Sequence, residues 1–301
     1  MSAAANEEVS ARSKLLKLTR RRLEKYATLL PKLLVSDDPE TVHHLRVWSR
    51  RLQQVLRVIA RSEQAHRIKK IMRVLRYVRR TLGPCRDLDV NIALLQSKRE
   101  ANGTGSVQRA WQAMQSELES QRQVLIEQVR RDIAGRDHFK FITQVQALIA
   151  RAAERDYDPL EQTTAAMITS MDRWDESFTA AREQPDAAAL HALRIAGKKL
   201  RYRAELLAAL GQPKVNPLVK VLKEIQKTLG DWHDRSVLLH HVAAFIGRPA
   251  FLADHPDIGR ILLAEMEKER LRNDSDVAIV LEQAAKVREA WINLKTRVAA
   301  V

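Results

Sequence analysis

Cysteine, aromatic residues and turn-forming residues are all scarce in this chain. It has one cysteine, Cys85, which excludes an internal disulfide framework and a cysteine-based zinc site. Glycine and proline number nine each, and aromatic residues make up 5% of the sequence. Strands favour aromatic side chains and turns favour glycine and proline, whereas alanine, leucine, arginine and glutamate favour helices. The composition therefore predicts an all-α fold.

Export and membrane signals are also missing. The first ten residues, MSAAANEEVS, lack the basic and then apolar pattern of a signal peptide, and no apolar run approaches the length of about 18 residues that indicates a membrane helix. We therefore predict a cytoplasmic protein. The 301 residues are 45% hydrophobic, which is enough to bury a core. We expect a disordered segment over residues 1–8 and a single domain over residues 9–301.

The charge of the chain is strongly one-sided. Lysine and arginine number 52 against 37 acidic residues, which gives a formal net charge of +15 and an isoelectric point of about 10.2. Such a charge increases self-repulsion in the compact state, so it favours a negatively charged partner. Composition alone does not identify that partner.

Apolar residues recur with helical periodicity from near Val9 to the end of the chain. Clusters of glycine, proline and aspartate interrupt this pattern and predict where helices end. These predicted breaks lie at residues 36–40, 82–87, 101–106, 134–137, 155–159, 183–186, 211–217, 229–234 and around 246–249. No stretch combines alternation with β-branched residues strongly enough to predict a strand.

An internal repeat divides the chain in two. Residues 42–59 align with residues 190–207, and residues 74–90 align with residues 221–237 at nearly the same offset. The repeat is far longer than the roughly 20–50 residues of a solenoid unit. We therefore predict two pseudo-symmetric helical bundles from an internal duplication, with repeat 1 over about 9–157 and repeat 2 over about 158–301.

Basic residues form stripes along the predicted helices of the aligned blocks. Between residues 42 and 80 there are 12 lysines and arginines against one acid, whereas a merely solvated face mixes both signs. The stripes of the second half carry fewer basic residues, and Glu205 stands on the stripe where the first half has Arg57. We predict that the stripes converge on a shared basic groove or pore that follows a chain of phosphates. The alternative is that these stripes are only the solvent-exposed faces of surface helices.

Two L-G-x-x-x-D segments accompany the stripes. Gly83 and Gly230 suit the position just after a helix, and Asp87 and Asp234 suit the cap of the next helix. We therefore predict turns at both places. The alternative is that the two aspartates hold nearby arginines in position.

Signals of catalysis and of metal binding are weak. The chain has no phosphate-binding glycine loop, no nucleophile elbow and no H-E-x-x-H pattern. His43 and His191 occupy equivalent places beside the basic stripes, where a phosphate contact or a structural hydrogen bond is the simpler interpretation. We expect a non-catalytic protein without a cofactor or a metal.

The aligned blocks resemble a known family. The pattern V-H-x-L-R-V-x-x-R-R-L at 42–52, its copy L-H-x-L-R-I-x-x-K-K-L at 190–200 and the two L-G-x-x-x-D segments are similar to the conserved histidine α-helical domain, or CHAD. The resemblance implies two related helical bundles with a basic cavity that binds inorganic polyphosphate, and members are often associated with polyphosphate granules. In the second half several arginines become lysine and Arg79 becomes Gln226, which puts the contribution of that half in question.

The basic stripes and the resemblance together define one predicted polyphosphate-binding set. It comprises His43, Arg46, Arg50, Arg51, Arg57, Lys69, Arg73, Arg76, Arg80, His191, Arg194, Lys198, Lys199, Arg201, Lys220, Lys223 and Lys227.

Other functions compete with polyphosphate binding. The main alternative is binding to the phosphate backbone of a nucleic acid, which the high isoelectric point also fits. Single-strand binders place aromatic residues among their basic residues, whereas here Trp48 falls on the apolar side and Tyr77 and Tyr202 lie off the centres of the stripes. An enzyme acting on polyphosphate and a protein binding anionic lipid are the remaining alternatives.

Overall fold

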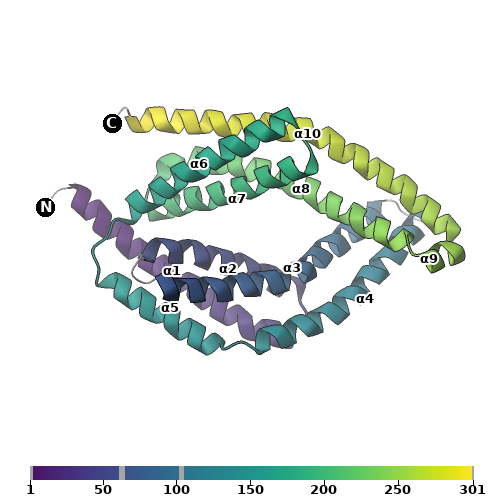
Figure 1. Ribbon diagram of the computed structural model, residues 1–301, viewed down its shortest axis with the longest axis horizontal. Coiled ribbons are helices and arrows are strands. Elements are labelled where there is room, and N and C mark those ends of the chain that lie inside the picture. The colour runs from purple at the N-terminus through teal and green to yellow at the C-terminus, as the bar shows by residue number, and fades with distance from the viewer. Residues whose placement is uncertain (1–2, 61–64, 102–104, 300–301) are drawn as a thin grey trace.

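The computed structural model describes residues 3–60, 65–101 and 105–299, and these ranges contain helices and no strand. The helices are α1 (Ala3–Val35), α2 (Pro39–Ile59), α3 (Ala65–Ala101), α4 (Ser106–Ala134), α5 (His138–Ala153), α6 (Pro159–Glu183), α7 (Ala187–Leu210), α8 (Asn216–Ile246), α9 (Pro249–Asp254) and α10 (Pro256–Ala299), with a short 3₁₀ turn η2 (Pro213–Val215) before α8 (Figure 1). The prediction of an all-α fold is confirmed.

Aspartates cap most of the helices that follow a predicted break. Asp38 precedes α2, and its carboxylate accepts hydrogen bonds from the backbone N–H groups of Glu40 and Thr41 at 3.1 and 3.0 Å. Asp158 and Asp186 cap α6 and α7 in the same way. These caps satisfy N–H groups that a helix leaves unpaired in its first turn, so the helices begin where the sequence predicts.

Two of the predicted breaks are wrong, because α3 runs through residues 82–87 and α8 runs through residues 229–234. Leu82 and Cys85, on either side of Gly83, are fully buried, and burial of the surrounding turn stabilises the helix against the weak propensities of glycine and proline. Two breaks were not predicted, one after α2 at Ala60 and one between α9 and α10 at His255.

The first helix begins earlier than the apolar periodicity near Val9 indicates. α1 starts at Ala3, within the 1–8 segment that the sequence predicts to be disordered, and residues 1–2 lie outside the described residues. Alanine has the highest intrinsic helix propensity, which favours extending α1 back through its alanine-rich start.

Three hydrophobic clusters form the core. The first joins α1, α2, α3, the end of α4 and α5, and the second joins α6, α7, α8 and α10. The third lies at the far end of the molecule, where α3 and α4 meet α8 and α10. Each of the first two clusters falls within one half of the chain, apart from Leu206 and Leu210 of α7, which join the first. The duplication itself and the boundary near residue 157 stay predictions.

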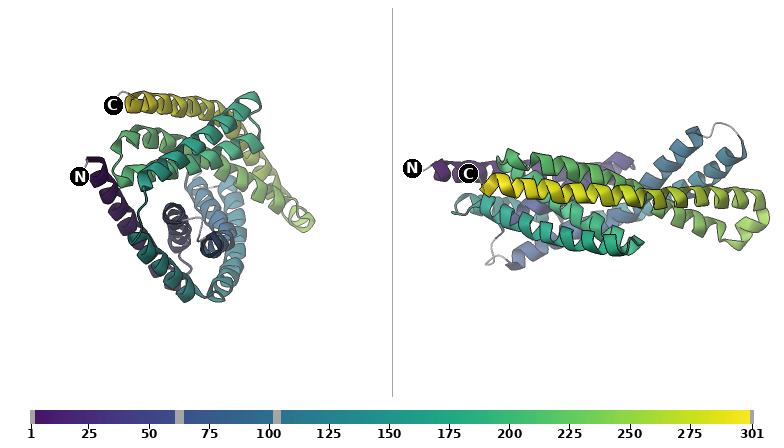
Figure 2. Two further views of the ribbon diagram at one scale, coloured as in Figure 1. Left: turned by 60° about the vertical axis from the view of Figure 1, so that its left-hand side comes forward. Right: turned by 90° about the horizontal axis from the view of Figure 1, so that it is seen from above.

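The two halves meet at both ends of the molecule. Figures 1 and 2 show the layer of α1–α5 facing the layer of α6–α10, with both termini at one end and α9 at the other. Leu206 and Leu210 connect the halves near the termini, and the third cluster connects them at the α9 end. The helices that carry the aligned blocks, α2 with α3 and α7 with α8, lie on the facing sides between these two connections.

Candidate functional site

Arg46 of α2 is half-buried against α3. Its Nη1 donates a hydrogen bond to the backbone carbonyl oxygen of Arg79 at 2.7 Å. A Cβ atom at residue 83 would lie 3.1 Å from the same Nη1, so Gly83 leaves the space that this guanidinium occupies. The glycine of the first L-G-x-x-x-D segment therefore serves the packing of Arg46, whereas the sequence predicted that it ends a helix.

Arg79 itself belongs to the site, although the predicted set omits it. Its side chain is half-buried, and burial together with repulsion from Arg50, Arg57 and Arg46 lowers its pKa to about 10. A guanidinium stays protonated at neutral pH even so. Arg79 therefore adds a charge that its own half does not neutralise.

The second half contributes a matching cluster from α7 and α8. Lys198 is half-buried, and burial lowers its pKa to about 7. Repulsion from Arg194 and Arg50 contributes to this shift, while attraction to Asp234 opposes it. Burial also lowers the pKa of His233 to about 4, with repulsion from Arg194 adding to the effect, so this imidazole is neutral at neutral pH.

A direct contact joins the two clusters. Arg50 of α2 donates from Nη1 to the hydroxyl oxygen of Tyr202 in α7 at 3.1 Å. The Cζ of Arg201 lies 4.9 Å from the centre of the same ring, which places a second guanidinium within cation–π range. The sequence placed Tyr202 off the centre of the basic stripe on its own helix. It did not predict the contact with Arg50, because this arginine belongs to α2 and a projection of one helix contains no other helix.

Four residues from the duplicated motifs share one electrostatic neighbourhood. Asp87 of α3 is attracted to Arg46 in its own half and to Arg194 in the other. Arg194 is attracted in turn to Asp234 and to Asp87. Both aspartates lie inside helices, so the capping role predicted for them is wrong. Their positions fit the alternative interpretation, in which they orient the motif arginines.

Several buried donors at this place have no hydrogen-bond partner among the described residues. They include the Nε atoms of Arg194 and Arg201 and the Nε2 atom of Gln226. An unpaired buried donor costs about 1–3 kcal/mol, more when it is charged. A ligand rich in acceptor oxygens would pair these groups.

The structure places the predicted residues in three groups. The electrostatic cluster between the halves contains Arg46, Arg50, Arg57, Arg76, Arg194, Lys198 and Arg201, with His43 beside Arg46 and His191 beside His233. Six residues are exposed along α3 and α8: Lys69, Arg73, Arg80, Lys220, Lys223 and Lys227. The remaining two are directed elsewhere. Arg51 lies 5.0 Å from the ring of Trp48, and Lys199 lines a separate cavity between α6 and α7 with Arg173.

Sequence reasoning missed Arg79, Tyr202 and His233 and misassigned Asp87 and Asp234. The arginine-orienting role of the aspartates was the open alternative in the sequence, because they repeat in both halves at nearly the same distance from the repeated arginine, 41 and 40 residues. The other three have no counterpart of the same type in the opposite half, where Gln226, Gln54 and Arg86 stand at the aligned positions. For them the duplication gives no signal.

The site offers cations and hydrogen-bond donors, and few groups suited to chemistry. Within the described ranges no three His, Cys, Asp or Glu side chains gather as metal ligands would. Burial raises the pKa of the Cys85 thiol to about 11, which keeps it protonated and unreactive at neutral pH.

The family model of the CHAD domain matches residues 17–243, about three quarters of the chain. The chain belongs to the CHAD family. Among curated proteins, no sequence matches.

Two solved structures share the CHAD fold of this chain. The CHAD domain from the plant Ricinus communis has a TM-score of 0.67 and 20% sequence identity, and the match covers 90% of this chain and 91% of that one. PptA from Streptomyces chartreusis has a TM-score of 0.61 and 13% identity, and the match covers 91% and 99% of the two chains. At these identities the likeness is one of fold. Each helix in the described part of this CHAD protein is too short or too polar to serve as a membrane span.

Proposed function

We propose that this protein binds inorganic polyphosphate without catalysis, in the cation cluster between α2–α3 and α7–α8. The observation that supports the proposal most strongly is the convergence of Arg46, Arg50, Arg79, Arg194 and Lys198 from both halves. Burial and repulsion from neighbouring cations lower the pKa values of Arg46, Arg79, Arg194 and Lys198, so the free site is electrostatically unfavourable. A linear polyanion would relieve that repulsion and fill the unpaired donors.

The exposed basic residues extend this proposal. Lys69, Arg73 and Arg80 lie along α3, and Lys220 and Lys223 lie along α8. A long chain of phosphates could leave the central cluster and follow these residues, as a polyanion follows a basic stripe. The central cluster would then determine the site, and the exposed residues would add salt-dependent affinity.

The second candidate function is binding to the phosphate backbone of a nucleic acid. Tyr202, in contact with Arg50 and Arg201, favours it, because aromatic rings among cations are typical of single-strand binders. However, the two guanidinium groups already occupy the surroundings of this ring, so the site is better suited to phosphate than to a stacked base.

Calorimetric titration with long-chain polyphosphate tests the proposal, and the chain supplies matched controls. Lys198 lies in the cluster, whereas its neighbour Lys199 lines the α6–α7 cavity and serves as its control. Arg50 contacts the other half, whereas its neighbour Arg51 lies on Trp48 and serves as the second control. Lys198→Gln and Arg50→Gln should each weaken binding about tenfold, since a charge-assisted contact contributes about 1.5–3 kcal/mol. Lys199→Gln and Arg51→Gln should change it less than threefold.

An RNA of matched charge, titrated in parallel, separates the two candidate functions. Tighter binding to polyphosphate with loss in the two cluster variants supports the proposal, while equal affinity for both ligands with equal loss in all four variants would show a generic basic surface. Phosphate release on incubation with polyphosphate and Mg²⁺ would overturn the non-catalytic part. Association with polyphosphate granules in the cytoplasm follows from the proposal, and imaging of a fluorescently labelled Arg50→Gln variant beside the wild type tests it.

A further inference from the structure

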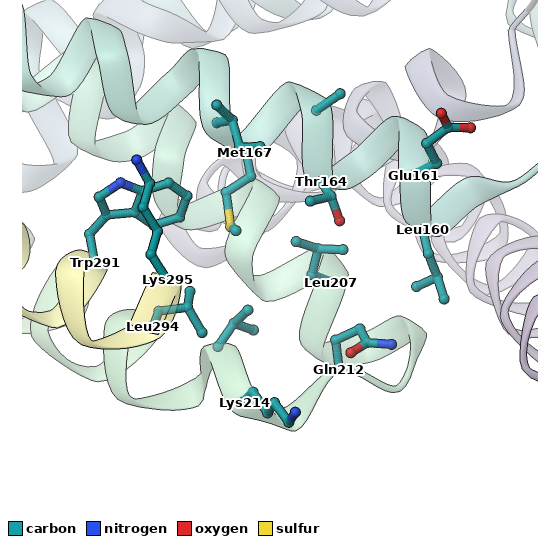
Figure 3. Close-up of a pocket in the computed structure, with 13 residues that line it drawn as sticks. Leu160, Glu161, Thr164, Met167, Leu207, Gln212, Lys214, Trp291, Leu294 and Lys295 are labelled. Atoms are coloured by element: carbon teal, nitrogen blue, oxygen red, sulfur yellow. The ribbon is translucent and has the colours of Figure 1, made fainter. Parts of the chain in front are cut away.

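A second cavity, apart from the cation cluster, lies at the end of the molecule that carries the termini. It has a volume of about 670 Å³ and is bounded by α6, the last turn of α7, η2 and the last turns of α10 (Figure 3). This volume falls within the range of about 300–1,000 Å³ that is typical of small-molecule sites. None of the cations of the central cluster lines it.

The walls of this cavity are mostly apolar. Leu160, Met167, Leu207, Val215, Trp291 and Leu294 form them. Trp291 and Leu294 keep only 7% of their surface exposed, whereas Ile168 at the edge is 44% exposed. The cavity is therefore an open, apolar depression in an otherwise polar helical surface, which is unfavourable in water unless something apolar occupies it.

The rim of the cavity is positively charged. Two lysines line it, Lys214 of η2 and Lys295 of α10, against one acid, Glu161. The Nζ of Lys295 lies 5.2 Å from the centre of the Trp291 ring, so a cation–π contact holds this ammonium above the apolar wall. Figure 3 shows Glu161 on the opposite side of the cavity from Trp291 and Lys295, where it does not neutralise Lys295.

The first and last helices of the first half, α1 and α5, leave a smaller space between them. The buried rings of Tyr26 and Phe141 lie 5.2 Å apart there. Another cavity, of about 230 Å³, is lined by Leu23 of α1 and Ile149 of α5 among other residues. In the second half the first and last helices, α6 and α10, border the cavity of about 670 Å³, so the larger of these two openings belongs to the second half.

From the apolar walls and the cationic rim together, we infer that this cavity binds an amphiphilic carboxylate of the fatty-acid class. The alkyl chain lies against Met167, Leu207 and Trp291, and the carboxylate pairs with Lys295 or Lys214. This function is separate from polyphosphate binding and does not depend on it.

Fluorescence and calorimetry with dodecanoate, below its micelle concentration, test the inference. A brominated dodecanoate should quench tryptophan fluorescence, and the quenching should disappear in Trp291→Phe, which keeps an aromatic wall. The double variant Lys214→Gln/Lys295→Gln should bind dodecanoate at least about tenfold more weakly, because a charge-assisted contact is removed. Lys199→Gln, which alters an exposed lysine of another cavity, should bind as the wild type does.

A blocking variant and a ligand of opposite charge complete the test. Thr164 is exposed on the cavity wall, so Thr164→Trp should fill the cavity and abolish binding while circular dichroism shows an intact helical fold. Dodecylamine should bind at least about tenfold more weakly than dodecanoate, since it meets two cations at the rim. Equal binding of the amine and the carboxylate, or unchanged binding in the lysine and Thr164 variants, would overturn the inference. Polyphosphate titration of the same variants should be unaltered, so failure of one proposal leaves the other distinguishable.

Discussion

Polyphosphate binding should weaken as the pH rises from about 6 to about 9, and Lys198 should cause most of the change. Burial and the neighbouring arginines lower the pKa of Lys198 to about 7 in the free protein. A bound polyanion favours the protonated form and raises this pKa, so binding takes up a proton above pH 7. If the complex keeps Lys198 protonated, the dissociation constant rises about tenfold at pH 8 and about 100-fold at pH 9.

Three histidines near the cluster do not add to this slope. Burial lowers the pKa of His233 to about 4, and burial also lowers the pKa values of His43 and His241 below the usual value of 6.5. These three imidazoles are neutral over most of the range, so their charge changes little. The stability of the free protein should have the opposite slope. Because the pKa of Lys198 is lower in the folded state than in the unfolded state, the free energy of unfolding rises as the pH increases from about 7 towards 10.5.

Calorimetry at several pH values, in two buffers of different ionisation enthalpy, measures both the affinity and the proton uptake. Lys198→Gln should flatten the pH profile and remove the proton uptake, whereas Lys199→Gln should preserve both. If the affinity of Lys198→Gln keeps the full pH dependence, the proton binds elsewhere and Lys198 is not its cause. Thermal denaturation without ligand provides the second readout, since its pH dependence should also flatten in Lys198→Gln alone.

Further predictions concern packing, reactivity and salt. Gly83→Ala should weaken polyphosphate binding severalfold, measured by calorimetry with helicity unchanged, because the new Cβ lies 3.1 Å from Arg46 Nη1 and displaces this guanidinium. Gly197→Ala should lower the free energy of unfolding in urea by about 1–3 kcal/mol, because the added Cβ lies 2.6 Å from Trp174 Cζ3 and overpacks the α6–α7 contact. Cys85 should resist a thiol reagent in the folded protein and react once urea unfolds it, since it is fully buried and its pKa is raised to about 11. The affinity for polyphosphate should fall linearly with the logarithm of salt concentration, by analogy with nucleic acids, and each charge removed from the cluster should reduce that slope by about one.

The sequence predicted the helices well where a local signal ends them. Asp38, Asp158 and Asp186 cap helices at predicted breaks, because capping depends on a few neighbouring residues. It failed at Gly83 and Gly230, where burial of the adjacent turns overrides the weak helix propensity of glycine.

The candidate site was predictable in outline and not in membership. The repeat predicts that Arg46 and Arg194 belong to the site. The membership of Tyr202 depends on how α2 lies relative to α7, and a projection of a single helix does not contain that information. Lys198 and Lys199 are neighbours of the same type in the sequence. The packing of α7 against its neighbouring helices places Lys198 in the cluster and Lys199 in the α6–α7 cavity, and the sequence alone does not show this packing.

The last helix, which lies entirely beyond the matched family region, ties the molecule into one cooperative unit. α10 contributes Val280, Val287 and Trp291 to the core of the second half, and it contributes Leu262 to the cluster at the α9 end, where α3 and α4 of the first half are also buried. Loosening α10 therefore exposes apolar surface in both places at once. Unfolding should thus occur in a single transition, and a chain shortened within α10 should lose both its helical layers together.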